Sequence, residues 1–182
     1  EVDVLTLTAT PIPRTLHMAL GGIRELSIIN DPPEGRLPIR THAARYTDDL
    51  VRRAVLRELD RDGQVFYVHN RVESIYHVQE HLQRLIPGAR VGVGHGQLNE
   101  DDLEQTMLDF LARRFDILLC TTIIESGLDI PNVNTIVVDN CDLLGLAQLY
   151  QLRGRVGRAD RQAYSYFLFG RRGKLTPQAA ER

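Results

Sequence analysis

Short apolar runs alternate along the chain with longer segments in which apolar residues recur three or four positions apart. The short runs, bounded by turn residues, are typical of buried strands, and the longer segments are typical of amphipathic helices. This alternation predicts an α/β fold with a central, mostly parallel sheet and helices on both faces. The predicted strands are Val4–Leu7, Ile39–Ala43, Val65–Val68, Arg90–Val93, Ile117–Thr121, Ile136–Val138 and Tyr166–Phe169.

Three long helices are predicted between these strands, at Asp48–Arg61, Arg71–Ile86 and Glu100–Arg113. Asn99 stands immediately before the third helix, where an asparagine side chain caps the first free N–H groups. A shorter segment, Leu146–Arg153, is also helical by its spacing. The apolar faces of these segments predict core packing and not a coiled coil.

The segment from Asn30 to Pro38 contains three prolines and a glycine, which is incompatible with a helix or a central strand. We therefore expect residues 30–37 to be a linker between two domains. Residues 1–29 are then the end of a preceding domain and residues 38–170 a complete one. Residues 171–182 begin the segment that follows.

Composition narrows the class of protein. With 182 residues and 43% hydrophobic content, the chain can bury a substantial core. Neither a membrane span nor a signal peptide is readable, so we expect a soluble cytoplasmic protein. Cys120 and Cys141 are too few for a disulfide framework and are expected to be packed or free thiols. His77 and His81 share a helix face, but no third ligand is evident, so no metal site is expected.

The most distinctive chemistry is the string Gly154-Arg-Val-Gly-Arg158, which follows the predicted helix Leu146–Arg153. On a continuing helical turn, Arg155 and Arg158 would project to the same side, and the glycines would leave room for a backbone or a phosphate. A guanidinium aimed at a γ-phosphate accelerates phosphoryl transfer by about 10³–10⁵. A solvated basic helix end is the alternative that the string alone leaves open.

The longer string Gln151–Arg158 resembles motif VI of superfamily 2 helicases, and further motifs of that family follow the expected order. Leu118–Pro131 resembles motif V, Val65–Ser74 resembles motif IV, and Thr8-Ala-Thr10 resembles motif III. The resemblance implies a RecA-like helicase C-terminal lobe in which Arg155 and Arg158 are catalytic. It also implies that Gly127, Asp129, Gln151 and Gly154 face the nucleotide, and that Thr8, Ala9 and Thr10 couple the two lobes.

Polar residues follow three of the predicted strands, and ligands of parallel sheets bind at the carboxyl ends of strands. Hydroxyls and the free N–H groups of a helix N-terminus suit a phosphate backbone. The resemblance implies nucleic-acid contacts by the residues at these ends, which are His69, Asn70, Arg71, His95, Gly96, Thr121 and Thr122. Asn70 as a plain helix N-cap is an equally good reading of that one residue.

The extended string Thr8–Thr15 resembles the double-stranded DNA translocases that include the RecG helicases and the bacterial transcription-repair coupling factors. The run Gln64–Ile75, which enters its helix directly, favours the coupling factors. That resemblance implies duplex DNA as the track. RNA polymerase and excision-repair proteins would then be partners of other domains. Two alternatives remain, a RecG-type fork-remodelling helicase and a non-catalytic nucleic-acid-binding or docking module.

Two motifs of a complete ATPase are absent from this sequence. It contains no Gly-x-x-x-x-Gly-Lys-Ser/Thr phosphate loop and no Asp-Glu-x-His motif to hold Mg²⁺. We therefore expect ATP and Mg²⁺ to be bound mainly by a preceding lobe, and the chain alone to hydrolyse no ATP.

Overall fold

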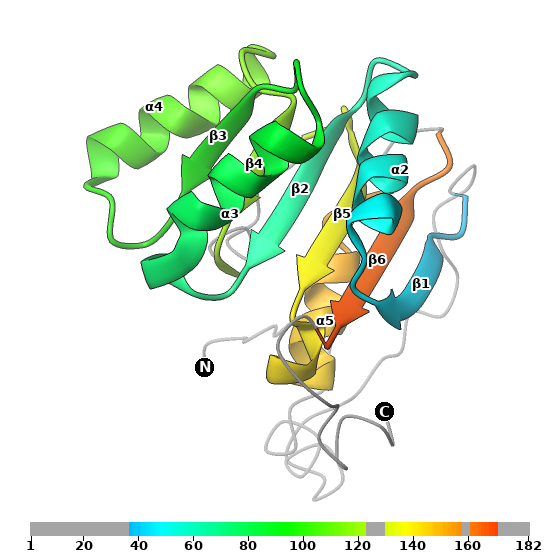
Figure 1. The fold of residues 1–182 in the computed structure, drawn as a ribbon. Helices are drawn as coiled ribbons and strands as arrows, with labels where there is room; N and C mark the ends of the chain where they lie inside the picture. The colour runs from blue at the N-terminus through cyan, green and yellow to red at the C-terminus, as the bar shows by residue number, and fades with distance from the viewer. Residues whose placement is uncertain (1–36, 123–129, 158–160, 171–182) are drawn as a thin grey trace, which may run out of the picture. The chain divides into compact units, whose positions relative to one another are not determined.

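A computed structural model describes residues 37–122, 130–157 and 161–170. These residues form a six-stranded sheet in the order β1-β6-β5-β2-β4-β3, and all neighbouring strands are parallel (Figure 1). The strands are β1 (Arg40–Arg45), β2 (Gln64–His69), β3 (Val91–Gly94), β4 (Ile117–Cys120), β5 (Val133–Asp139) and β6 (Tyr164–Phe169). The predicted α/β class with a parallel sheet is confirmed. The predicted strand Val4–Leu7 lies outside the described residues.

Helices pack on both faces of the sheet, and each face has its own core. The helices are α2 (Asp48–Leu59), α3 (Val72–Leu85), α4 (Glu100–Leu111) and α5 (Leu146–Arg153), with a short 3₁₀ turn, η2 (Cys141–Leu143), before α5. Apolar residues of α2 and α3 share one core, and those of α4 and α5 share the other. No helix in the described ranges is long and apolar enough to cross a membrane.

The buried strand β2 supplies both cores because successive side chains of a strand point to opposite faces. Val65 and Tyr67 pack against α2 and α3, whereas Phe66 and Val68 pack on the side of α4 and α5. The Phe66 ring lies 5.7 Å from that of Phe110, measured between centroids. An apolar run without alternation is therefore the pattern expected for a central parallel strand.

Side-chain hydrogen bonds fix the starts of α2 and α4. The Thr47 hydroxyl accepts a hydrogen bond from the Leu50 N–H at 3.2 Å, and the Asn99 side chain accepts one from the Asp102 N–H at 2.7 Å. The predicted cap at Asn99 is confirmed. The reading of Asn70 as an N-cap is wrong, because the N-cap of α3 is Arg71 and no side chain caps this helix.

Asp116 ties the start of β4 to the start of β3. Its carboxylate accepts two hydrogen bonds from the Arg90 guanidinium, at 2.7 and 3.0 Å, and one from the Arg90 backbone N–H at 2.8 Å. Partial burial acts to raise the pKa of Asp116, but the hydrogen bonds and charge of Arg90 outweigh it and hold that pKa below its ordinary value. The same contacts raise the pKa of Arg90.

Asp116→Asn is expected to lower the thermal unfolding midpoint at neutral pH, because the pair forms only with an ionised carboxylate. A lowered folded-state pKa stabilises the protein above the unfolded value of about 3.9, and the contribution is lost as pH falls through the folded-state pKa. The difference between the two proteins should therefore shrink below about pH 4. A difference independent of pH would show that the ion pair is not its cause.

Candidate functional site

Three loops that are far apart in the sequence meet at one edge of the sheet. They follow β2, β4 and β3, which are neighbours in that order, so their carboxyl ends lie side by side (Figure 1). The Thr121 N–H donates to the Gly94 carbonyl oxygen at 3.4 Å, and the Tyr76 hydroxyl lies 3.2 Å from His95 Nε2. We call the residues here the strand-end surface; they are Asn70, Arg71, His95, Gly96, Thr121 and Thr122.

His69 lies directly behind this surface and is only 4% exposed. Its Nδ1 donates to Asp139 Oδ2 at 3.0 Å, and its Nε2 lies 2.8 Å from the Ser74 hydroxyl oxygen. Asp139 is fully buried at the end of β5. Both ring nitrogens of His69 are therefore engaged within the protein. Direct contact with a phosphate would break one of these bonds, whereas the neighbouring Asn70 and Arg71 are exposed.

His95 is also buried, at 5% exposure, and shapes the loop after β3. Its Nδ1 accepts a hydrogen bond from the Gln97 N–H at 3.3 Å, so the neutral ring carries its proton on Nε2 and donates it to the Tyr76 hydroxyl. The two rings meet edge to face, with centroids 5.9 Å apart. Gly96 and the Gln97 that follows it are exposed.

At the end of β4, Thr121 is nearly buried and Thr122 is half-buried. Several predicted site residues lie outside the described ranges, and their roles stay predictions: Thr8, Ala9, Thr10, Gly127, Asp129 and Arg158.

Arg155 does not lie on a helix. α5 ends at Arg153, Gly154 is its C-cap, and the Arg155 N–H donates to the Leu152 carbonyl oxygen at 3.0 Å in a tighter turn. The expectation that Arg155 projects from a continuing helix is therefore wrong. Two features stop the helix: Val156 turns into the core, and Gly157 adopts a φ of 78°. We call residues 154–157 the arginine loop.

Gly157 serves packing as well as the turn. A β-carbon there would lie 2.9 Å from Ile39 Cγ1 and 3.2 Å from Ala163 Cβ, in a backbone conformation that side chains disfavour. The close neighbours of this glycine are thus side chains of the protein itself. The expected room for a backbone or phosphate is not what requires glycine at this position.

The arginine loop and the strand-end surface lie at different places on the sheet. Ile39 and Ala163, which contact Gly157, immediately precede β1 and β6, whereas the strand-end surface follows β2, β3 and β4. The connection between them runs from the end of β5 through η2 and α5. Asp139 lies at the start of this connection and is hydrogen-bonded to His69. The His69–Asp139 pair therefore links the strand-end surface to the segment that leads to the arginine loop.

Sequence reasoning missed Asp139, Ser74 and Tyr76, the partners of the two buried histidines. Only Asp139 had a readable signal, since an acidic residue directly follows the apolar run Ile136–Val138 at a strand end. In the described part of the chain, no three His, Cys, Asp or Glu side chains are grouped so as to hold a metal ion. His81 instead lies 2.9 Å from Asp48 Oδ1.

Both cysteines are buried free thiols, as expected. Desolvation raises the pKa of Cys120 well above its ordinary range. Burial and the nearby Asp142 carboxylate raise the pKa of Cys141 to about 11. Neither thiol is therefore a nucleophile at neutral pH.

The parallel six-stranded sheet with helices on both faces is the RecA-like fold of helicase C-terminal lobes. The chain belongs to the family described as helicase conserved C-terminal domain, which matches residues 47–160. It is 56% identical over its whole length to the transcription-repair-coupling factor of Staphylococcus haemolyticus strain JCSC1435, and 55% identical to that of Staphylococcus epidermidis strain ATCC 12228. The chain spans 16% of the length of each of these curated relatives.

Two solved structures place the fold. The structure of RecG bound to a three-way DNA junction aligns with a TM-score of 0.77 at 36% identity, covering 96% of this chain and 23% of that one. Saccharomyces cerevisiae Dbp5 bound to RNA and ADP BeF3 aligns with a TM-score of 0.64 at 19% identity, covering 90% and 44%. The second likeness concerns the fold alone.

Proposed function

We propose that the chain is the second motor lobe of an ATP-dependent double-stranded DNA translocase that couples transcription to nucleotide excision repair by displacing stalled RNA polymerase. The observation that carries this proposal is the meeting of three helicase-motif loops at adjacent strand ends, with the arginine loop set apart from them. The identity to transcription-repair-coupling factors along the whole chain supports the coupling role.

In this proposal the strand-end surface holds the phosphate backbone of duplex DNA without reading its sequence. The exposed Arg71 guanidinium and Asn70 amide donate to phosphate oxygens. No side chain caps α3, so the N–H groups of its first turn are suited to an anion. Gly96 and Thr122 complete the contact. His69 and His95 hold these loops in place, with Thr121 between them.

In this proposal the chain contributes catalytic side chains to an ATP molecule that is bound largely by another lobe. Arg155 and Arg158 stabilise the charge that develops on the γ-phosphate, with Gly127, Asp129, Gln151 and Gly154 near the nucleotide. The described residues supply the arginine loop, but they contain no phosphate-binding loop motif and no cluster of metal-binding side chains. They thus fit a role across the interface between lobes, with Mg²⁺ bound elsewhere. The isolated chain is accordingly proposed to be inactive.

The proposed coupling role implies protein partners in addition to DNA. RNA polymerase and excision-repair proteins would bind other domains of the longer, cytoplasmic protein. The second candidate is a RecG-type fork-remodelling helicase, favoured by the TM-score of 0.77 to RecG. A non-catalytic docking module fits the strand-end surface but leaves the paired arginines without a role. A polymerase-binding domain in the sequence that precedes this chain would favour the coupling role.

Arg71→Ala in the longer protein is expected to weaken duplex DNA binding about fivefold, because one charge-assisted phosphate contact is lost. The loss should be equal for duplexes of different sequence, and the slope of log K against log salt should fall by about 1. Fluorescence anisotropy at several salt concentrations measures both. Arg84→Ala, in the last turn of the same helix, is the matched control. Unchanged affinity and salt slope in Arg71→Ala would remove α3 from the DNA interface.

A further inference from the structure

β1 is an edge strand with a regular, accessible outer side. Its six residues pair in unbroken parallel register with β6, the single neighbour of β1 among the described strands. The N–H groups of Arg40 and Tyr46 donate to carbonyl oxygens of Ala163 and Phe169, each at 2.9 Å. Hydrogen-bonding direction alternates along a strand, so every second residue faces β6. The main-chain N–H and C=O groups of Thr41, Ala43 and Arg45 therefore point away from the sheet.

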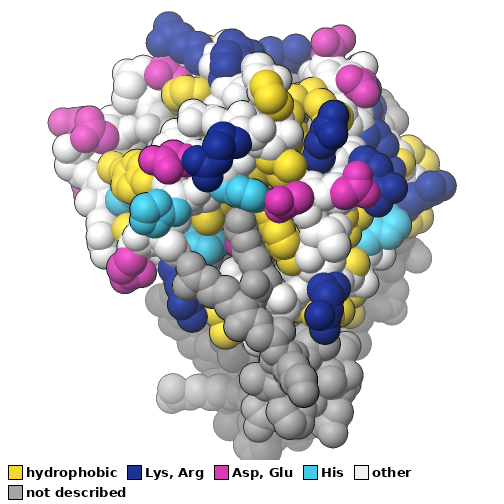
Figure 2. Space-filling model, in the orientation of Figure 1, with side chains coloured by type: hydrophobic (Ala, Val, Ile, Leu, Met, Phe, Trp, Pro, Cys, Tyr) yellow, Lys and Arg dark blue, Asp and Glu magenta, His cyan; other side chains and the backbone are white. Residues whose placement is uncertain are grey.

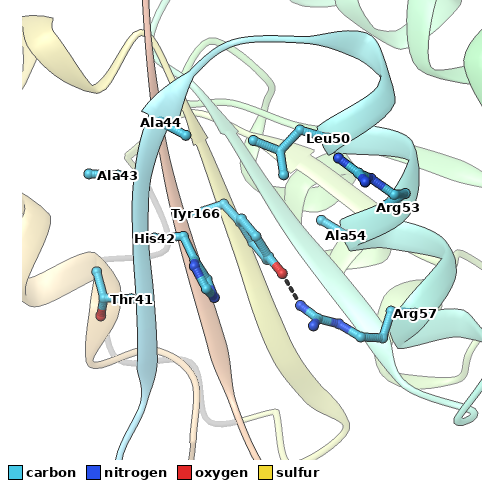
Figure 3. Close-up of a pocket in the computed structure, with 9 residues that line it drawn as sticks. All are labelled: Thr41, His42, Ala43, Ala44, Leu50, Arg53, Ala54, Arg57 and Tyr166. Atoms are coloured by element: carbon cyan, nitrogen blue, oxygen red, sulfur yellow. Dashed lines mark hydrogen bonds between the residues drawn. The ribbon is translucent and has the colours of Figure 1, made fainter.

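A hollow of about 680 Å³ runs beside this strand, between β1 and α2. We call it the β1 groove; it is lined by Thr41, His42, Ala43 and Ala44 of β1, by Leu50, Arg53, Ala54 and Arg57 of α2, and by Tyr166 of β6 (Figure 3). Its volume lies within the range of about 300–1,000 Å³ that is typical of binding pockets. The groove lies along the strands and not at the strand-end surface.

Contacts within the protein hold the side chains of Arg57 and His42 in place beside the groove. The Arg57 guanidinium lies 3.7 Å from the centre of the Tyr164 ring and donates to the Tyr166 hydroxyl. The His42 ring stacks on Tyr166 with centroids 5.1 Å apart, and His42 and Arg57 reach toward the same space in Figure 3. A guanidinium positioned in advance loses less freedom when it binds an anion.

The acidic residues near the groove are already engaged, one of them with Arg53 of the groove itself. Asp48 pairs with His81, Asp49 pairs with Arg53 at 2.9 Å, and Glu58 is buried beside Arg61. Arg40 and Arg45 are exposed at the two ends of β1. Figure 2 shows arginine side chains, with acidic side chains among them, on the side of the molecule where α2 and β1 lie in Figure 1. With Arg53 paired to Asp49, the charges of Arg40, Arg45 and Arg57 give the groove and its strand a net positive charge.

We propose that β1 is a docking strand for an extended acidic peptide of a partner protein. The peptide pairs with the outward main-chain groups of Thr41, Ala43 and Arg45 and extends the sheet by one strand. Its alternate side chains then point to the α2 side, where carboxylates meet Arg57 and compete with Asp49 for Arg53.

The outer edge of β1 favours an acidic peptide over nucleic acid and over a second copy of the same strand. A strand offers donors and acceptors in alternation, which a peptide backbone matches, whereas a phosphodiester backbone supplies acceptors alone. Cationic residues on an edge strand oppose pairing with a second copy of the same strand, because like charges would lie across from one another. The same cations attract an acidic strand.

The proposal is tested by fluorescence anisotropy of a labelled peptide of about ten residues, alternating glutamate and valine, titrated with the 182-residue chain. Saturable binding is expected, weakened at least about tenfold by Arg57→Glu, since charge-assisted contacts are replaced by repulsion. Ala43→Pro should weaken binding similarly, because it removes an outward N–H without removing a bond to β6. Arg84→Glu, on α3, is the charge-matched control.

Two altered peptides keep the test independent of protein folding. Peptides with N-methylated alternate amides, or with lysine in place of glutamate, should each bind at least about tenfold more weakly. Equal binding of either one, or no binding of the acidic peptide, overturns the proposal. Duplex DNA binding that is lost in Arg57→Glu but kept in Ala43→Pro would assign the groove to nucleic acid instead. Dimerisation of the chain that Ala43→Pro abolishes would assign the edge to a second copy.

Discussion

Arg155→Ala and Arg158→Ala, each made in the longer protein, are expected to lower DNA-stimulated ATP hydrolysis at least about tenfold, with a smaller change in nucleotide affinity. Guanidinium groups that act on the γ-phosphate stabilise charge that develops only in the transition state, so turnover falls more than binding. Steady-state hydrolysis with saturating duplex DNA and titration with a fluorescent nucleotide measure the two quantities separately.

Two control variants distinguish a loss of catalysis from a loss of folding. Arg84→Ala removes an exposed arginine of α3, outside the proposed sites, and should retain normal turnover. Arg155→Lys keeps the charge but loses the planar arrangement of donors. Its rate of ATP hydrolysis should therefore lie between those of Arg155→Ala and the unmodified protein. Unfolding midpoints establish that each variant is folded. Near-normal turnover in both alanine variants would refute the catalytic assignment.

His69→Ala is expected to lower the free energy of unfolding by about 2–4 kcal/mol, because it takes from the buried Asp139 carboxylate a hydrogen-bond partner 3.0 Å away. Urea unfolding of the 182-residue chain measures this loss. In the longer protein the same change should also reduce the stimulation of ATP hydrolysis by DNA, since His69 joins the strand-end surface to the connection that leads to the arginine loop.

A double-mutant cycle with Asp139→Asn isolates the pair. The neutral amide retains the shape of Asp139, so a shared interaction predicts that the two changes together cost at least about 1 kcal/mol less than their sum. Strict additivity would mean that the pair contributes no coupling. Ser74→Ala removes the partner of Nε2 in a bond that is only part-buried, so it should be the mildest change of the three.

The helices and most strands followed directly from hydrophobic spacing, but β2, β5 and β6 were predicted too short because each includes buried polar residues. β5 begins at Val133 although Asn134 and Thr135 follow it, because the Thr135 hydroxyl donates to Glu58 Oε2 at 2.5 Å inside the core. A local pattern cannot show that such a partner exists, since Glu58 belongs to another element. Burial of a polar side chain depends on that distant partner.

The convergence of the strand-end loops was predictable because parallel neighbours bring their carboxyl ends to one edge. The burial of His69 and His95 was not, since Asp139 lies 70 residues from His69 and Tyr76 lies 19 from His95. The path of the arginine loop was also missed. Helical spacing continues through Arg155, and only the packing of Val156 and Gly157 against the core ends the helix.

β1 precedes β2 in the chain, yet its neighbour in the sheet is β6, the last described strand. During synthesis, β1 must therefore wait for more than a hundred intervening residues before it can pair, whereas the edge of β5 stays uncovered only until β6, which begins at Tyr164, has been made. A chaperone that recognises uncovered strands would meet β5, all of whose residues are buried in the finished sheet. A protein trimmed to residues 47–160 would keep that edge uncovered permanently, because both β1 and β6 fall outside those limits.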